Sequence, residues 1–180
     1  MGGGKNLSDA LREIKCVNIT YNDTVTALHR AKHEQVKSER AAFRTRLEAV
    51  DARFAERALC LKLEHVKNRA AVEKELRDAK GDMLASGCVI SDDLLRFNNL
   101  RDECLQRITA LQTAYDEAKT DLAVQHLKEG QAVRQQRDDA VSAILNKYRD
   151  LVRAEVLRRD ERTMEIISKY CSYDKDSADK

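Results

Sequence analysis

Apolar residues in the second half of the chain recur at the spacing of a helix that packs along one side. One such run consists of Cys104, Ile108, Leu111, Tyr115, Ala118 and Leu122. Its steps alternate between four and three residues, which is the heptad pattern of a coiled coil. The spacing loosens toward Ile144 and Tyr148, and Gly130 interrupts the stripe. The pattern predicts a long helix over 92–170, in which Gly130 marks a flexible or a tightly packed point.

The first half carries a similar stripe with a slightly longer spacing. Its members are Phe43, Leu47, Val50, Phe54, Ala58, Leu61, Val72, Leu76, Ala79 and Met83. The eleven steps from Phe43 to Met83, counted through the polar His65 and Asn68, average about 3.64 residues, whereas a left-handed coil has 3.5 and an eleven-residue repeat 3.67. This spacing predicts a first helical arm over 7–86 that supercoils little.

Three segments lack the helical pattern. Three successive glycines make the start of the chain costly to order, so we expect residues 1–6 to be flexible. Residues 171–180 lose the apolar periodicity and are expected to fray. Between the arms, Gly87 has the place of a helix-ending residue and Ser91 that of the next N-cap, so the sequence predicts a turn over 87–91.

Residues 17–24 form a weaker stretch within the first arm. They lie in a segment dense in β-branched residues and Asn, which are poor helix formers. We therefore expect a break near Asn22 and Asp23, with a short separate helix before it.

Two arms of nearly equal length joined by a short turn favour an antiparallel arrangement. Composition supports this interpretation, because the 180 residues include no Pro and are 36% charged. Such a chain has much surface and little core. The predicted fold class is all-α: a long antiparallel helical hairpin, similar to a coiled coil, with flexible termini.

Polar residues near the predicted stripe indicate that the hairpin needs a partner. Lys32, Arg40, His65 and Asn68 lie close to stripe positions, where polar groups set register and partner choice at a cost in stability. A two-helix hairpin buries only one stripe per helix, so we expect a second copy or other helical proteins to pack against it. The candidate partner-binding residues are Phe43, Leu47, Val50, Phe54, Leu61, Ile108, Leu111, Tyr115, Leu122, Ile144 and Tyr148.

The sequence offers little for catalysis, metals or cofactors. The five cysteines are far apart and form no CxxC pair, and His29 with His33 supplies two ligands where a metal site normally needs at least three. No phosphate-binding loop is present. We expect no enzyme activity, no metal and no cofactor.

The net charge and the N-terminal residues bear on two other classes of partner, nucleic acid and membranes. The net charge of +2 supplies no overall field for nucleic acid, and the basic residues of 40–57 alternate with acidic ones, so we expect no nucleic-acid binding. Gly2 resembles a myristoylation signal, although Asn6 stands where Ser or Thr is preferred. Membrane binding is expected only if Gly2 is lipidated, since one acyl chain binds only marginally.

These observations lead to two hypotheses of different class. The first is a non-enzymatic scaffolding protein that packs against partner helices in a larger assembly, of the kind common in the cytoskeleton and cilia. The alternative is a peripheral membrane module with a lipid anchor at Gly2 and a basic face over residues 30–69. The chain has no signal-peptide core and no long apolar run, so we expect a cytoplasmic protein that associates with the cytoskeleton.

Overall fold

The structure, a computed structural model, describes residues 3–85 and 91–178, with side chains over 7–85 and 92–170. It contains two helices, α1 (Gly3–Ala85) and α2 (Ser91–Ala178), and no strand within those ranges. The predicted fold class, an all-α helical hairpin, is confirmed.

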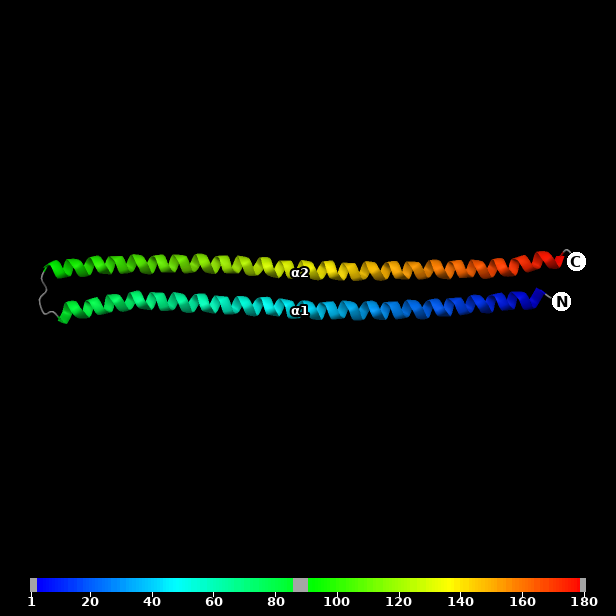
Figure 1. The fold of residues 1–180 in the computed structure, drawn as a ribbon, viewed down its shortest axis with the longest axis horizontal. Coiled ribbons are helices and arrows are strands. Elements are labelled where there is room, and N and C mark those ends of the chain that lie inside the picture. Colours follow the sequence, from blue (N-terminus) through cyan, green and yellow to red (C-terminus); the bar gives the residue numbers. More distant parts are fainter. Residues whose placement is uncertain (1–2, 86–90, 179–180) are drawn as a thin grey trace. The chain divides into compact units, whose positions relative to one another are not determined.

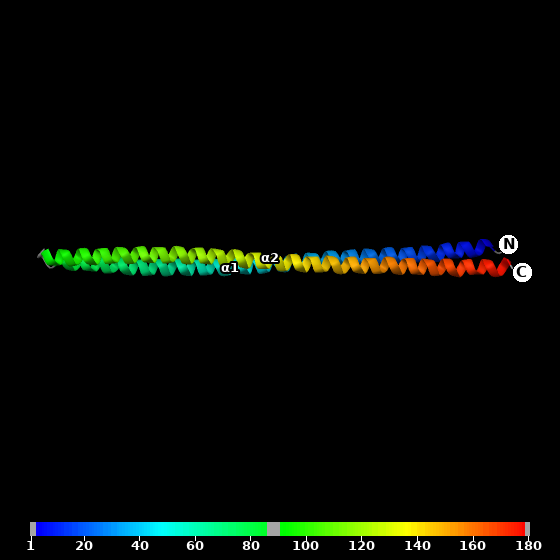
Figure 2. The same ribbon diagram turned by 90° about the horizontal axis from the view of Figure 1, so that it is seen from above.

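The chain divides into two compact units, and each contains a part of both helices. Unit 1 comprises residues 1–44 and 134–180, and unit 2 comprises residues 45–133. Within unit 1, the N-terminal part of α1 lies beside the C-terminal part of α2 and runs in the opposite direction (Figure 1). Within unit 2, the remaining parts of the helices are paired in the same way, and the second view agrees (Figure 2).

The seam between the two helices follows an eleven-residue repeat. In α1, a buried or half-buried side chain stands at every eleventh position, at Ala10, Tyr21, Lys32, Phe43, Phe54, His65 and Leu76. In α2 the corresponding series is Cys104, Tyr115, His126, Arg137, Tyr148, Arg159 and Tyr170. Eleven residues make three turns of about 3.67 residues, close to the 3.6 of a straight α-helix, so within each unit the seam residues keep facing the other helix.

The two series face one another in a fixed register. Phe54 contacts His126 with ring centroids 4.9 Å apart, and His65 stacks on Tyr115 at 4.4 Å, both within unit 2. In unit 1, the Arg137 guanidinium lies 4.7 Å from the centre of the Phe43 ring. Arg159 lies 4.8 Å from that of Tyr21. The two residue numbers of each of these pairs add up to 180, and we call such a pair a layer.

The heptad prediction for the second arm holds only locally. All six residues of the predicted run, from Cys104 to Leu122, are buried or half-buried. Around Ala118 the heptad step is retained, because Ala118 is half-buried and Lys119 is exposed. Over the whole of α2, however, the seam repeats every eleven residues. The eleven-residue period prevails because the seam residues of α2 have to face those of α1, which also recur every eleven residues.

The predicted break in the first arm is wrong, because α1 continues through residues 17–24. The Thr20 hydroxyl donates to the backbone carbonyl of Cys16 at 3.1 Å, and that of Thr24 donates to the carbonyl of Thr20 at 2.9 Å. These hydroxyls are therefore satisfied inside the helix instead of competing with it. Val17 and Tyr21 are half-buried on the seam, so tertiary packing compensates for weak helix propensity.

The ends of the helices also differ from the predicted boundaries. Helix α1 begins at Gly3, and α2 continues to Ala178. Both helices therefore extend beyond the predicted arms, and the flexibility of the terminal segments stays a prediction. Extending an existing helix costs far less than nucleating one, which explains how poor helix formers are included at its ends.

The predicted turn falls mostly outside the described residues, which omit 86–90. Helix α2 begins at Ser91, and Asp92 and Asp93 lie in its first turn, where carboxylates stabilise the helix dipole. Gly130 is buried on the seam, yet a Cβ built on it would meet no atom within 4 Å. Gly130 is thus not a tightly packed point, and α2 passes through it without a break.

Candidate functional site

The most deeply packed aromatic ring of unit 2 is surrounded by cationic and imidazole groups. The Phe54 side chain is 4% exposed. The guanidinium carbons of Arg53 and Arg57 lie 5.7 and 5.3 Å from its ring centre, and His126 packs against it. The ring face attracts cations, so this layer combines burial with electrostatic contacts. His126 Nε2 lies 2.7 Å from a carboxylate oxygen of Asp51, which fixes the imidazole in place.

The polar residues that we expected near the stripe divide into two groups. Lys32 and His65 are half-buried at layer positions. The Nζ of Lys32 is 3.4 Å from Nδ1 of His29, and His65 stacks on Tyr115. Arg40 and Asn68 are exposed beside the seam. Two of the four therefore take part in the layers.

Four polar contacts between the helices lie on one side of the seam, whereas Asp51, which contacts His126, stands on the other side. Residues one before and three after a layer position point to the same side, because turns of about 100° backward and 300° forward end within about 40° of each other. Four cross-helix pairs in the two units occupy these positions: Glu13–Lys169, Arg53–Glu129, Arg57–Gln125 and Glu75–Arg107. We call this the ion-pair side of each unit.

The opposite side of each unit carries exposed apolar residues. Positions one after and three before a layer residue point there. In unit 1 these positions include Leu7, Leu11, Leu145 and Ile167, and in unit 2 they include Val66, Leu105 and Leu127; all are more than 40% exposed. We call it the apolar side. Among the described residues, Leu151 is the one large exposed apolar side chain at the ion-pair positions. The two sides of the seam are therefore chemically different.

The residues predicted to bind partners lie on the seam. Val50, Phe54 and Tyr148 are buried. The remaining eight are half-buried: Phe43, Leu47, Leu61, Ile108, Leu111, Tyr115, Leu122 and Ile144. Each unit uses these side chains to join its own two helices, and their contact with a partner stays a prediction. Sequence reasoning missed the exposed apolar side, although its residues stand either one after or three before the layer positions.

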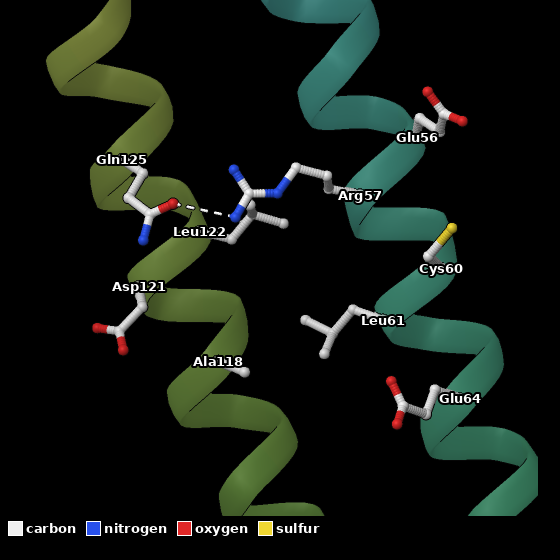
Figure 3. Close-up of a pocket in the computed structure, with 9 residues that line it drawn as sticks. All are labelled: Glu56, Arg57, Cys60, Leu61, Glu64, Ala118, Asp121, Leu122 and Gln125. Carbon is white, nitrogen blue, oxygen red and sulfur yellow. Dashed lines mark hydrogen bonds between the residues drawn. The ribbon is translucent and has the colours of Figure 1, made fainter.

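A groove of about 530 Å³ lies on the ion-pair side of unit 2 (Figure 3). Leu61 and Leu122 point toward one another at its floor, and Arg57 reaches across to donate to the Gln125 side-chain oxygen at 3.1 Å. The remaining lining residues are Glu56, Cys60, Glu64, Ala118 and Asp121. An apolar floor with three carboxylates on the rim suits the long side chain of a Lys or Arg from a partner.

A second groove, of about 500 Å³, lies on the apolar side of unit 1 and has the opposite charge. Val36, Ala41 and Leu145 supply its apolar atoms. Its rim consists of Lys32, His33, Lys37, Arg40 and Arg44. An apolar floor with a basic rim suits an acidic or anionic amphipathic group.

A polar cluster around Glu13 lies between the two helices of unit 1. The Tyr170 hydroxyl donates to its carboxylate at 2.7 Å, and the Lys169 ammonium donates at 3.2 Å. The hydrogen bond from Tyr170, followed by that from Lys169, holds the pKa of Glu13 below its ordinary value of 4.5. The same carboxylate raises the pKa of Tyr170 and of Lys169. The cluster joins the two helices beside the layer of Ala10 and Tyr170.

The described residues give no indication of a metal site or of a membrane span. No three His, Cys, Asp or Glu side chains come together there as metal ligands would. Neither helix has, within those residues, an apolar stretch long enough to cross a bilayer. Of the cysteines whose side chains are described, Cys16 and Cys60 are exposed and Cys104 is buried, all as free thiols. Gly2, the candidate lipidation site, lies outside the described residues.

Comparison of the chain with protein-family models, with curated proteins and with solved structures gave no match in any of the three.

Proposed function

We propose that the protein is a non-enzymatic structural protein whose paired helices hold partner helices in a larger assembly. The observation that carries the proposal is the difference between the two sides of the seam. Cross-helix ion pairs and small side chains occupy one side of each unit, whereas exposed Leu, Ile and Val side chains stand on the other, together with Asp51 in unit 2 and the basic groove rim in unit 1. Large apolar side chains that recur in exposed positions on one face are a feature of protein interaction sites.

The spacing of the exposed residues favours a helical partner. Leu105 and Leu127 both follow a layer position directly, so they present the same face of α2 two repeats apart. A partner helix with apolar residues at the matching spacing can pack along them, as ridges pack into grooves. A cytoskeletal or ciliary setting is the context that we expect for such a scaffold.

Cross-linking affinity purification from the native cells tests this function. We expect proteins with long helices to cross-link to the wild-type chain and to be lost with the Leu105→Glu, Leu127→Glu double variant. The matched control is Leu95→Glu, because Leu95 is as exposed but lies at a different offset from the layer positions. Equal recovery of the same proteins with the double variant and with the wild type would contradict the proposal.

A second candidate function rests on the basic groove of unit 1. Lys37, Arg40 and Arg44 line it around Val36 and Leu145, and an anionic lipid surface offers both charge and apolar contact. This corresponds to a peripheral membrane module anchored through a lipidated Gly2. Mass spectrometry of the native N-terminus, together with cosedimentation with phosphatidylserine vesicles, tests it. An unmodified terminus and no cosedimentation would exclude this function.

A further inference from the structure

Helix α1 carries a further apolar stripe in unit 2, which includes Val66 of the apolar side and continues onto the face turned away from the seam. The stripe consists of Ala52, Ala55, Leu59, Leu63, Val66 and Ala70, all exposed. Its steps of three and four residues span the same three turns per eleven residues as the seam. Leu59 is 57%, Leu63 59% and Val66 53% exposed. A stripe of this regularity is the pattern of a helix that packs on a second helix.

The order of side chains along the stripe reads nearly the same in both directions. Ala52 and Ala70 stand at its ends and Leu59 and Leu63 at its centre, and the members of each pair are equally distant from residue 61. Ala55 and Val66 depart from this symmetry by one residue. If two copies of α1 lie antiparallel with residue 61 at the midpoint, Leu59 of one copy faces Leu63 of the other. Self-complementarity of this kind is what a two-fold interface requires, because the same patch serves both partners.

One pair of opposite charges beyond the ends of the stripe has the same symmetry. Glu48 and Lys74 occupy the next stripe positions beyond the two ends, and they are equally distant from residue 61. In the antiparallel arrangement each Glu48 faces a Lys74, twice in every dimer. Opposite charges at mirrored positions favour this register over a shifted or a parallel one.

We infer that a second copy of this chain docks on residues 52–70 of α1, antiparallel and related by a two-fold axis near residue 61. The inference rests on the proposed function, since it names one partner of the scaffold. It concerns the outward stripe of α1, whereas the test of the proposed function concerns Leu105 and Leu127 of α2. A chain that is monomeric but still binds partner helices through α2 therefore contradicts this inference alone.

Sedimentation equilibrium of the full chain over a range of concentrations provides the first test. We expect a reversible dimer for the wild type, and a Kd raised more than about hundredfold in Leu59→Glu, Leu63→Glu, because four carboxylates would enter the apolar contact. Leu95→Glu, at 61% exposure in the same unit, should dimerise like the wild type. Circular dichroism checks that each variant remains helical. A wild type that stays monomeric, or a double variant that dimerises unchanged, would overturn the inference.

A charge exchange tests the register. Glu48→Lys should raise the dimer Kd roughly tenfold, because it replaces two attractions with two repulsions. Adding Lys74→Glu should restore the wild-type Kd, since the pairs are then reversed but complementary. Failure of the second substitution to rescue the first would refute the antiparallel pairing. The charge exchange does not depend on any loss of folding, because both sites are exposed.

Discussion

Individual layer residues differ in how much they contribute to stability, and burial decides the order. Phe54 is buried between its own helix and His126, whereas Phe43 is only half-buried beneath Arg137. We expect Phe54→Ala to lower the free energy of unfolding by about 3 kcal/mol and Phe43→Ala to lower it by less. Urea unfolding followed by circular dichroism measures both. An equal or larger effect at Phe43 would contradict this order.

The Glu13 cluster predicts a pH dependence with a defined sign. Its folded-state pKa lies below the ordinary 4.5, so its stabilising contribution is present above about pH 4.5 and is lost as the pH falls through the folded-state pKa. For Lys169 and Tyr170 the folded-state pKa is raised, so their contributions are lost as the pH rises above their ordinary values of 10.5 and 10.0. The loss of this stabilisation in acid, which we call the acid limb, depends on Glu13.

The comparison of the wild type with Glu13→Gln measures this limb. We expect the variant to have a lower Tm at pH 7, and the difference in Tm to vanish well below pH 4.5, where the wild-type carboxylate is protonated too. Tyr170→Phe should raise the pKa of Glu13 toward 4.5, as seen by carboxyl NMR titration, because it removes the largest cause of the shift. A Tm difference that persists in acid would show that the carboxylate charge is not responsible.

At the scale of the helices, local propensity predicted a break in α1 at residues 17–24, whereas tertiary packing keeps the helix continuous there. The spacing of Phe43, Leu47 and Val50 predicted the seam of α1, because apolar periodicity reports which face is buried. The segment 17–24 misled the prediction, because its poor helix formers are held by hydroxyl bonds to the backbone and by contact with α2. Propensity over a few residues does not include contacts with a segment more than a hundred residues away.

Gly130 gives a prediction at the same scale. Its position in α2 is buried on the seam, but a methyl group there would meet no atom within 4 Å. We expect Gly130→Ala to stabilise unit 2 by about 1 kcal/mol through helix propensity. Gly81→Ala is the matched control, because Gly81 is exposed and also has open space. Urea unfolding compares the two variants. Destabilisation by the Gly130 substitution alone would indicate a closer packing than the geometry implies.

Across the molecule, the sequence predicted the seam better than the surface. Ten of the apolar residues from Phe43 to Met83 formed the stripe from which α1 was predicted, but the partner of each depended on the register of α2. The layer pairing became visible only with contacts such as Phe54–His126. His126 and Arg137 are polar, so the apolar periodicity did not assign them to the seam. They pack there against the aromatic rings of Phe54 and Phe43. The exposed apolar side was missed for the same reason: it is defined relative to the layers.

The register has a consequence for how the chain can change in length. Removing residues 56–66 together with 114–124 takes out one layer and leaves the flanking ones, Phe54 with His126 and Leu76 with Cys104, in phase. We expect that shortened protein to remain helical and to unfold cooperatively.

Deleting residue 60 alone should lower the Tm much more, because every later side chain of the first helix then turns by about 100° away from its counterpart. Thermal unfolding of the two deletions compares them, and similar Tm values would contradict the layer register. Insertions and losses in the history of such a chain should therefore come in matched blocks, one on each side of the turn.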